Sequence, residues 1–214
     1  MKVGILGTGV VGEALARGFL ALGHEVKMGG REARNEKALA FVKQAGPKAS
    51  AGTFADAAAF GEVLVLATLG AANPAVLEQA GEKNLAGKLL LDATNPLAHE
   101  PGKPPSLAIS GDDSGGQQVQ RLAPGARVVK AFNTVGNALF FRPQLPGGPP
   151  DMFICGDDAA AKKKATEIVT DFGWKAVDLG GIEASRYLEA MCIVWVRYGF
   201  ATGGWNHAFK LLSK

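Results

Sequence analysis

Residues 2–12 read KVGILGTGVVG, a short apolar run that passes directly into glycines spaced as GxGxxG. Val11, Leu15, Phe19 and Leu22 then recur at helical spacing up to Gly23, and residues 24–28 (HEVKM) have the pattern of a second strand. Strand, glycine turn, helix and strand in this order make up a dinucleotide-binding unit. We therefore expect such a unit at the N-terminus.

Each glycine of the turn has its own physical role in this interpretation. Gly7 lets the chain turn sharply out of the strand, Gly9 lets a pyrophosphate approach the backbone, and Gly12 lets the helix pack close to the sheet. The free N–H groups at the helix start and the positive end of its dipole then hold the phosphates. The predicted pyrophosphate site is therefore Gly7, Thr8, Gly9, Val10, Val11 and Gly12. A purely structural glycine turn is the alternative.

The end of the second strand indicates which dinucleotide binds. Residues 29–37 read GGREARNEK, with Gly30 and Arg31 where an NAD site has an Asp or Glu for the ribose 2′-hydroxyl. A guanidinium can bind a 2′-phosphate through two hydrogen bonds, whereas a carboxylate would repel it. We predict NADP(H) as the cofactor, held by Gly30 and Arg31 with Lys37 or Arg34 in support. The alternative is a solvated charge cluster, since two glutamates share the stretch.

Composition limits the classes of protein that this chain can belong to. The 214 residues are 47% hydrophobic and 20% charged, which is typical of a soluble globular protein. A net charge of +3 does not favour nucleic acid as a partner. Cys155 and Cys192 stand in apolar stretches as buried thiols would, and the three histidines have no metal-ligand spacing. Because no signal peptide precedes the first strand and no apolar run could span a membrane, we expect a cytoplasmic protein.

Strands and helices alternate along the rest of the chain. We expect strands at residues 62–68, 88–92, 127–132, 152–156 and 175–179, and helices at 36–45, 55–60, 73–81, 117–122, 159–172 and from 183 onward. Residues 48–53 read as a short strand or a loop, and residues 99–116 as a loop. This alternation predicts an α/β fold of the Rossmann type with a doubly wound parallel sheet. We place the dinucleotide-binding domain at 1–150 and a small C-terminal α/β and helical part at 151–214, which packs on it, lines the substrate pocket and could form a dimer contact.

Three further strand ends are candidates for the same site, because ligands of open parallel sheets bind outside the carboxyl ends of the strands. Thr68 and Leu69 could flank the adenosine ribose and the pyrophosphate. Asn95 could face the nicotinamide ribose, and Asn133, Thr134 and Val135 could meet the nicotinamide or the second substrate. Ordinary loop chemistry after a strand is the alternative for each of them.

No side chain stands out as a general acid or base, and we assign no catalytic residue and no metal ligand. This pattern suits hydride transfer between two bound rings, where the protein supplies orientation and water exclusion. The last predicted helix and the residues after it could form one side of a pocket for a flat ring, through Met191, Trp195, Tyr198 and Trp205. Core packing or a dimer seam is the alternative for most of them.

Six short stretches, in this order, carry a resemblance to a known family: residues 3–9, 23–26, 30–31, 94–97, 129–134 and 155–158. On these motifs the chain resembles the deazaflavin-dependent NADP oxidoreductases, which use coenzyme F420. It is also similar to the N-terminal reductase domain of the six-transmembrane ferric reductases, without their membrane segments. The resemblance covers nearly the whole chain.

The resemblance implies a role for each matching position. It places the pyrophosphate at residues 7–12, the 2′-phosphate at Gly30 and Arg31, the length of the cofactor along Thr68 and Leu69, and the nicotinamide near residues 133–135. It further implies direct hydride transfer between NADPH and a flat isoalloxazine-like ring, in a homodimer. We therefore expect an NADPH-dependent oxidoreductase whose second ring substrate is a deazaflavin or a flavin. Two alternatives remain: reduction of a flavin, a ferric chelate or a small carbonyl or imine, and a non-catalytic NADP-binding sensor.

Overall fold

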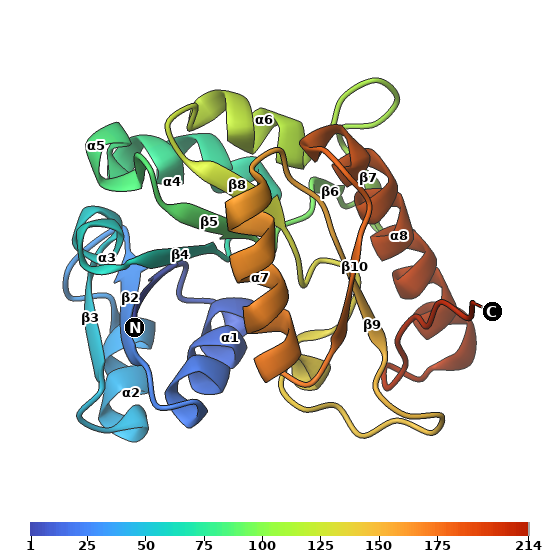
Figure 1. Cartoon of the computed structure of the whole chain (residues 1–214), viewed down its shortest axis with the longest axis horizontal. Coiled ribbons are helices and arrows are strands. Elements are labelled where there is room, and N and C mark those ends of the chain that lie inside the picture. The colour runs from blue at the N-terminus through green and yellow to red at the C-terminus, as the bar shows by residue number, and fades with distance from the viewer. Residues whose placement is uncertain (214) are drawn as a thin grey trace.

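The computed structural model describes residues 1–213, and a six-stranded parallel sheet forms its centre (Figure 1). The strand order is β3-β2-β1-β4-β5-β8, so the chain winds outward in both directions from β1. This order is that of the Rossmann fold, and it confirms the predicted fold class. The strands are β1 (Lys2–Leu6), β2 (Glu25–Gly30), β3 (Ala49–Thr53), β4 (Val63–Leu66), β5 (Leu89–Asp92) and β8 (Arg127–Lys130).

Helices cover both faces of this sheet. They are α1 (Val10–Ala21), α2 (Glu36–Ala45), α3 (Phe54–Phe60), α4 (Asn73–Ala80), α5 (Glu82–Leu85), α6 (Gly115–Leu122) and α7 (Ala159–Asp171), while α8 (Ser185–Thr202) packs on α6. Val63 and Val65 of β4 share a core with α1, α2 and α7, while Leu64 and Leu66 share a second core with α3 to α6. Successive strand residues thus face opposite cores, which explains why the strands read as unbroken apolar runs.

The C-terminal part continues the first of these two cores. β9 (Asp151–Ile154) and β10 (Lys175–Asp178) form a separate two-stranded parallel sheet, joined through α7. Phe172 packs edge-on against Phe19 of α1 at 4.9 Å between ring centroids, and the Trp174 indole N–H donates to the Phe140 carbonyl at 2.8 Å. The division at residue 150 remains a proposal, and Lys214 lies outside the described residues.

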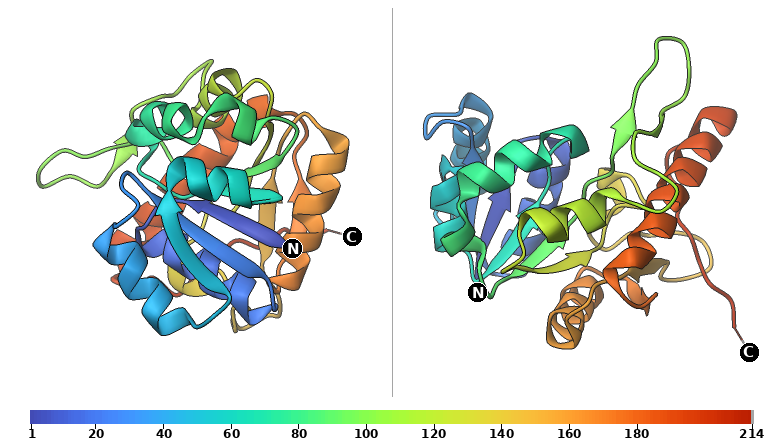
Figure 2. Two further views of the ribbon diagram at one scale, coloured as in Figure 1. Left: turned by 90° about the vertical axis from the view of Figure 1, so that its left-hand side faces the viewer. Right: turned by 90° about the horizontal axis from the view of Figure 1, so that it is seen from above.

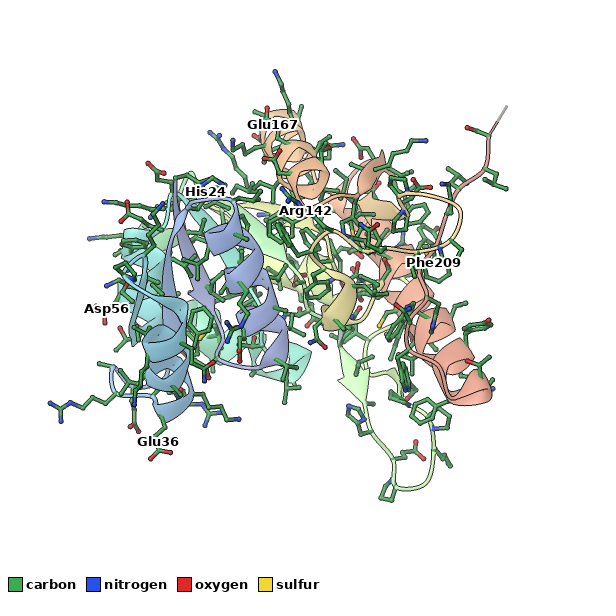
Figure 3. All side chains as sticks on the ribbon, turned by 90° about the horizontal axis from the view of Figure 1, so that it is seen from below. His24, Glu36, Asp56, Arg142, Glu167 and Phe209 are labelled. Atoms are coloured by element: carbon green, nitrogen blue, oxygen red, sulfur yellow. The ribbon has the colours of Figure 1, made fainter. Side chains whose placement is uncertain are left out.

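A short C-terminal segment follows α8 and runs back along β9. Gly203 ends the helix with a left-handed φ of 69°, which glycine adopts without strain. The Asp151 amide then donates to the Phe209 carbonyl at 3.0 Å. Figure 3 shows Phe209 near α8, on the side of the molecule away from Glu36 of α2. No helix within residues 1–213 is both long and apolar enough to cross a membrane.

Most predicted elements are present, and the differences have local causes. Residues 49–53 form strand β3, and α2 has the predicted bounds. The predicted loop at 99–116 was wrong near its middle and at its C-terminal end. It holds β7 (Ser106–Leu107), which pairs antiparallel with β6 (Leu97–Ala98) in a hairpin that stands away from the body of the fold (Figure 2), and α6 begins at Gly115 because the Ser114 hydroxyl accepts from the Gln117 amide. The four-residue helix α5 is too short to show a period in sequence.

A capping box begins α3 and provides a direct test of local stability. The Thr53 hydroxyl accepts from the Asp56 amide at 3.1 Å, and the Asp56 carboxylate accepts from the Thr53 amide at 2.8 Å. We expect Thr53→Ala to lower the free energy of unfolding by about 1 kcal/mol, measured by urea denaturation. Thr170→Ala is the matched control, because the exposed Thr170 hydroxyl bonds only within α7. Equal stability of the two variants would contradict the capping role.

The same capping box makes the stability of α3 depend on pH. Hydrogen bonds from the Thr53 backbone amide and from the Thr53 hydroxyl lower the pKa of Asp56 below its ordinary value of 3.8, and Thr53→Ala removes the second of them. A carboxylate with a lowered pKa in the folded state contributes stability above its unfolded pKa and loses it as the pH falls through the folded pKa. The difference between wild type and Thr53→Ala should therefore narrow below about pH 4.

Candidate functional site

A cavity of about 530 Å³ lies at the carboxyl ends of β1, β2 and β4. Ten of the fifteen residues predicted to bind cofactor line it: Gly7, Thr8, Gly9, Val10, Val11, Gly30, Arg31, Lys37, Thr68 and Leu69. Val10 and Leu69 are large apolar side chains that are 68% and 79% exposed. A volume in this range and an apolar lining with few polar groups are usual for a cofactor site.

The three glycines of the turn are required for three different reasons. Gly7 has a φ of 142°, and a Cβ there would lie 2.2 Å from the Ala67 carbonyl oxygen. A Cβ on Gly12 would lie 2.7 Å from the Gly7 carbonyl oxygen, so Gly12 allows α1 to approach β1 and does not line the cavity. A Cβ on Gly9 would meet no atom within 4 Å. Gly7 and Gly12 are therefore needed by the fold, and Gly9 leaves space that a ligand can occupy.

The start of α1 provides unpaired backbone donors beside this space. Gly9 is the N-cap residue and supplies no side-chain cap, and the first helical hydrogen bond runs from the Glu13 amide to the Gly9 carbonyl at 2.9 Å. The N–H groups of Val10, Val11 and Gly12 therefore have no partner within the helix. Together with the helix dipole they make a site for an anion.

Two cations follow β2 at the other wall of the cavity. Within residues 1–213, no carboxylate lies within 4.0 Å of the Arg31 or Lys37 side-chain nitrogens, so both charges are available to a ligand. Arg34 does not line the cavity. Asn35 does, and its side chain also caps α2 by accepting from the Ala38 amide at 3.1 Å. Sequence reasoning missed Asn35, although its place just before a helix marks it as a cap.

Four predicted residues lie at the neighbouring strand ends and do not line this cavity: Asn95, Asn133, Thr134 and Val135. The Asn133 side-chain amide donates to the Asn95 Oδ1 at 2.9 Å and to the Leu188 carbonyl of α8 at 3.0 Å. The Asn95 amide donates in return to the Asn133 carbonyl at 2.9 Å. Thr134 and Val135 are buried. These residues therefore fix the loop after β8 against α8.

The Asn133 side chain keeps one unused acceptor. Its Oδ1 is buried and has no hydrogen-bond partner. The contact with the Leu188 carbonyl requires an N–H donor, so the orientation of the amide is fixed and Oδ1 must face away from Leu188. Trp195 packs beside the same loop, because a Cβ on Gly136 would lie 2.8 Å from the Trp195 ring. The loop after β8 thus carries a buried acceptor without a partner, and it packs against the ring of Trp195.

A buried ion triad next to the site was not predicted. The Lys130 ammonium at the end of β8 lies 2.7 Å from the Asp92 carboxylate at the end of β5 and 2.9 Å from the Glu189 carboxylate of α8. Glu189 also accepts from the Gly115 and Gly116 amides at 3.0 and 2.9 Å. Burial by itself lowers the pKa of Lys130, but the two carboxylates outweigh it and raise this pKa to about 12. An Asp and a Lys closing two adjacent apolar strands were the signal that could have revealed the pair.

The two cysteines are buried and free, as predicted. Burial raises the pKa of the Cys155 thiol to about 12 and that of the Cys192 thiol to about 11. A thiol with so high a pKa is protonated at neutral pH and is a poor nucleophile. Neither cysteine is a candidate for covalent catalysis.

Comparison with known proteins identifies the relatives of this architecture. A family model described as "NADP oxidoreductase coenzyme F420-dependent" matches residues 2–96. The F420-dependent NADP reductase of Methanocaldococcus jannaschii is 33% identical over 201 residues, which cover 89% of this chain and 89% of that protein. A crystal structure from Arthrobacter sp. FB24, described as a candidate F420-dependent NADP-reductase, superposes over the full length of both chains with a TM-score of 0.92 and 38% identity.

A longer relative matches most of this chain with only part of its own length. Metalloreductase STEAP3 of Rattus norvegicus is 29% identical over 192 residues. These residues cover 89% of this chain, which spans 36% of the length of that protein.

Proposed function

This chain belongs to the family of coenzyme F420-dependent NADP oxidoreductases, and from that premise we propose that it transfers a hydride between NADP(H) and a flat deazaflavin ring. The observation that carries the proposal is the cavity of about 530 Å³. It joins the open start of α1 to two cations that have no carboxylate partner.

The residues present fit a phosphorylated dinucleotide. The Val10 and Val11 amides would hold the pyrophosphate, with Gly9 leaving room for it. Arg31 and Lys37 would hold the 2′-phosphate, since no acidic side chain lines the cavity where an NAD site has one. This arrangement favours NADP(H) over NAD(H).

The proposed reaction requires few catalytic groups from the protein. When bound, dihydronicotinamide would supply a hydride to the oxidised ring, and one proton from solvent would complete the reduction. Arg31 and Lys37 are the only ionisable side chains among the described residues that line the cavity, and both lie at the 2′-phosphate end. The protein therefore acts by holding the two rings in the orientation that hydride transfer requires. A carbonyl or imine substrate would in addition need a proton donor beside the nicotinamide.

We place the acceptor ring against the loop after β8. Trp195 is 8% exposed and stacks on His207 with 4.8 Å between ring centroids, which holds the indole in one orientation beside Gly136. A fixed aromatic side chain beside the loop after β8 suits the stacking of a flat ring.

The direct test is binding and turnover with the purified protein. NADPH and NADH are each offered with oxidised coenzyme F420, then with flavin mononucleotide, a ferric chelate and a cyclic imine. Turnover of F420 that is selective for NADPH is the expected result. Turnover only with another acceptor would replace the deazaflavin, and NADPH binding without any oxidation would favour a sensor.

Gly9 provides a test that separates binding from folding. Because a Cβ at position 9 meets no protein atom and φ is −85°, Gly9→Ala should fold with an unchanged melting temperature. The added methyl group occupies space next to the proposed pyrophosphate, and steric crowding of 1–3 kcal/mol corresponds to roughly 5- to 150-fold weaker NADPH binding. Calorimetric titration with NADPH measures it.

Gly125→Ala is the matched control for this test, since its added Cβ makes only an ordinary contact with Ala86 far from the cavity. Wild-type affinity in Gly9→Ala would move the pyrophosphate away from the start of α1.

We further propose a homodimer formed through the exposed face of α8. Tyr187, Val194 and Tyr198 are 56–62% exposed and lie on this helix at spacings that place them on one side. An exposed apolar stripe of this kind is typical of a protein contact. Val194→Glu should shift the sedimenting species from dimer to monomer, and a monomeric wild type would contradict the proposal.

The free buried thiols suit the reducing cytoplasm, where we place the protein.

A further inference from the structure

A continuous chain of hydrogen bonds connects the wall of the cavity with the buried ion triad. The Thr68 hydroxyl lies 2.9 Å from the Asn73 Oδ1, and the Asn73 Nδ2 lies 2.8 Å from the Thr94 Oγ1. The Thr94 Oγ1 lies 2.7 Å from Asp92, whose other oxygen lies 2.7 Å from the Lys130 ammonium. All of these residues except Thr68 are buried, and Thr68 lines the cavity.

The ion pair at the inner end sets the direction of every bond in this chain. Asp92 is paired with Lys130 and can only accept, so the single Thr94 proton must point to Asp92. The Thr94 oxygen then can only accept from Asn73, which requires the Nδ2 side of that amide. The opposite amide orientation would bring two acceptors together at 2.8 Å.

The orientation of the Asn73 amide in turn fixes the direction of the Thr68 hydroxyl proton at the cavity. With Nδ2 turned to Thr94, the Asn73 Oδ1 faces Thr68 and needs a donor, so the Thr68 proton points into the protein. The lone pairs of the Thr68 oxygen are left for the cavity. The Thr68 hydroxyl therefore accepts hydrogen bonds from the cavity and does not donate to it.

We propose that Thr68 accepts a hydrogen bond from a ribose hydroxyl of the bound dinucleotide, and that Asn73 and Thr94 are positioning residues that hold Thr68 in this state. This inference rests on the proposed function and assigns to Thr68 one particular contact with the bound cofactor. A pyrophosphate oxygen carries no proton and would be repelled by the Thr68 lone pairs. Thr68 nevertheless lies beside the pyrophosphate turn, because a Cβ on Gly7 would lie 3.3 Å from its methyl group. The groups that flank a pyrophosphate and carry donors are the two riboses.

The first experiment is calorimetric binding of NADPH to wild type, Thr68→Val and Thr68→Ser. Valine keeps the shape and removes the acceptor, so we expect roughly 5-fold weaker binding, and serine should retain the wild-type affinity. Two shorter probes distinguish the riboses. 2′,5′-ADP contains only the adenosine ribose, and 2′-phospho-ADP-ribose contains both. A loss with the second probe but not the first assigns the hydroxyl to the distal ribose, and a loss with both assigns it to the adenosine ribose.

The second experiment tests the positioning role of Thr94, which does not line the cavity. Thr94→Val frees the Asn73 amide to turn and the Thr68 proton to point outward, so NADPH binding should weaken by a factor similar to that of Thr68→Val. Thr94→Ser should restore it. In the double variant Thr68→Val/Thr94→Val the second loss should vanish, because no Thr68 hydroxyl is left to orient.

The outcomes separate this inference from the proposed function. If wild type binds no NADPH, the proposed function fails and the inference fails with it. If wild type binds NADPH and Thr68→Val binds equally well, only the inference fails. If the losses of Thr68→Val and Thr94→Val multiply in the double variant, Thr94 acts through general structure and not through Thr68.

Discussion

Replacing Arg31 by glutamate should weaken NADPH binding on the order of 100-fold while changing NADH binding less than about 3-fold. A charge-assisted hydrogen bond to a phosphate contributes about 1.5–3 kcal/mol, and a guanidinium can form two of them. Because Arg31 has no carboxylate partner among residues 1–213, the substitution breaks no ion pair of the protein itself. The loss therefore reports on the ligand. Calorimetric dissociation constants for both dinucleotides at 0.15 M salt measure it.

Arg34→Glu is the matched control for this prediction. It makes the same change of charge three residues away on an exposed side chain that does not line the cavity. At 0.15 M salt the Debye length is about 8 Å, so a general field effect of the charge change should be small and should appear in both variants. An equal loss of NADPH and NADH affinity in Arg31→Glu, or a loss as large in Arg34→Glu, would remove Arg31 from the 2′-phosphate site.

The parts of this protein that could be predicted from sequence are those whose cause is local. Gly7 must adopt a φ that other residues avoid, and its neighbours in sequence form the turn around it. The Thr53 cap and the apolar run of β4 likewise depend on residues that follow one another. Ten of the predicted cofactor residues therefore line one cavity, because the strand ends that carry them are adjacent in a sheet of known order.

The parts that could not be predicted join residues far apart in the chain. The Gly115 amide meets Glu189 across 74 positions, and Lys130 meets Asp92 across 38. Nothing in the residues around Glu189 distinguishes it from the exposed glutamates of other helices. The polarity of the Thr68 hydroxyl is likewise invisible in sequence, since it depends on a chain of contacts that ends at this triad.

Replacing Lys130 by methionine should destabilise the fold by about 3–5 kcal/mol. The change leaves Asp92 and Glu189 buried together without the cation that both of them face at 2.7 and 2.9 Å. The backbone amides of Gly115 and Gly116 still bind Glu189, but they neutralise no charge. For a chain of this size the loss corresponds to a drop in melting temperature on the order of 10 °C. Thermal and urea unfolding at pH 7.5 measure it.

Lys162→Met is the control, because its ion pair with Asp178 at 2.9 Å involves a half-exposed carboxylate and should contribute less than about 1 kcal/mol. The pH dependence gives a second signature. A lysine whose pKa is raised from 10.5 to about 12 on folding contributes its full stability below pH 10.5 and loses it as the pH rises through 12. The stability gap between wild type and Lys130→Met should therefore stay constant from neutral pH to about 10 and narrow above it. A gap no larger than that of Lys162→Met would mean that the two carboxylates bind protons or water in place of the ammonium, and it would also remove the fixed charge that orients Thr94, Asn73 and Thr68.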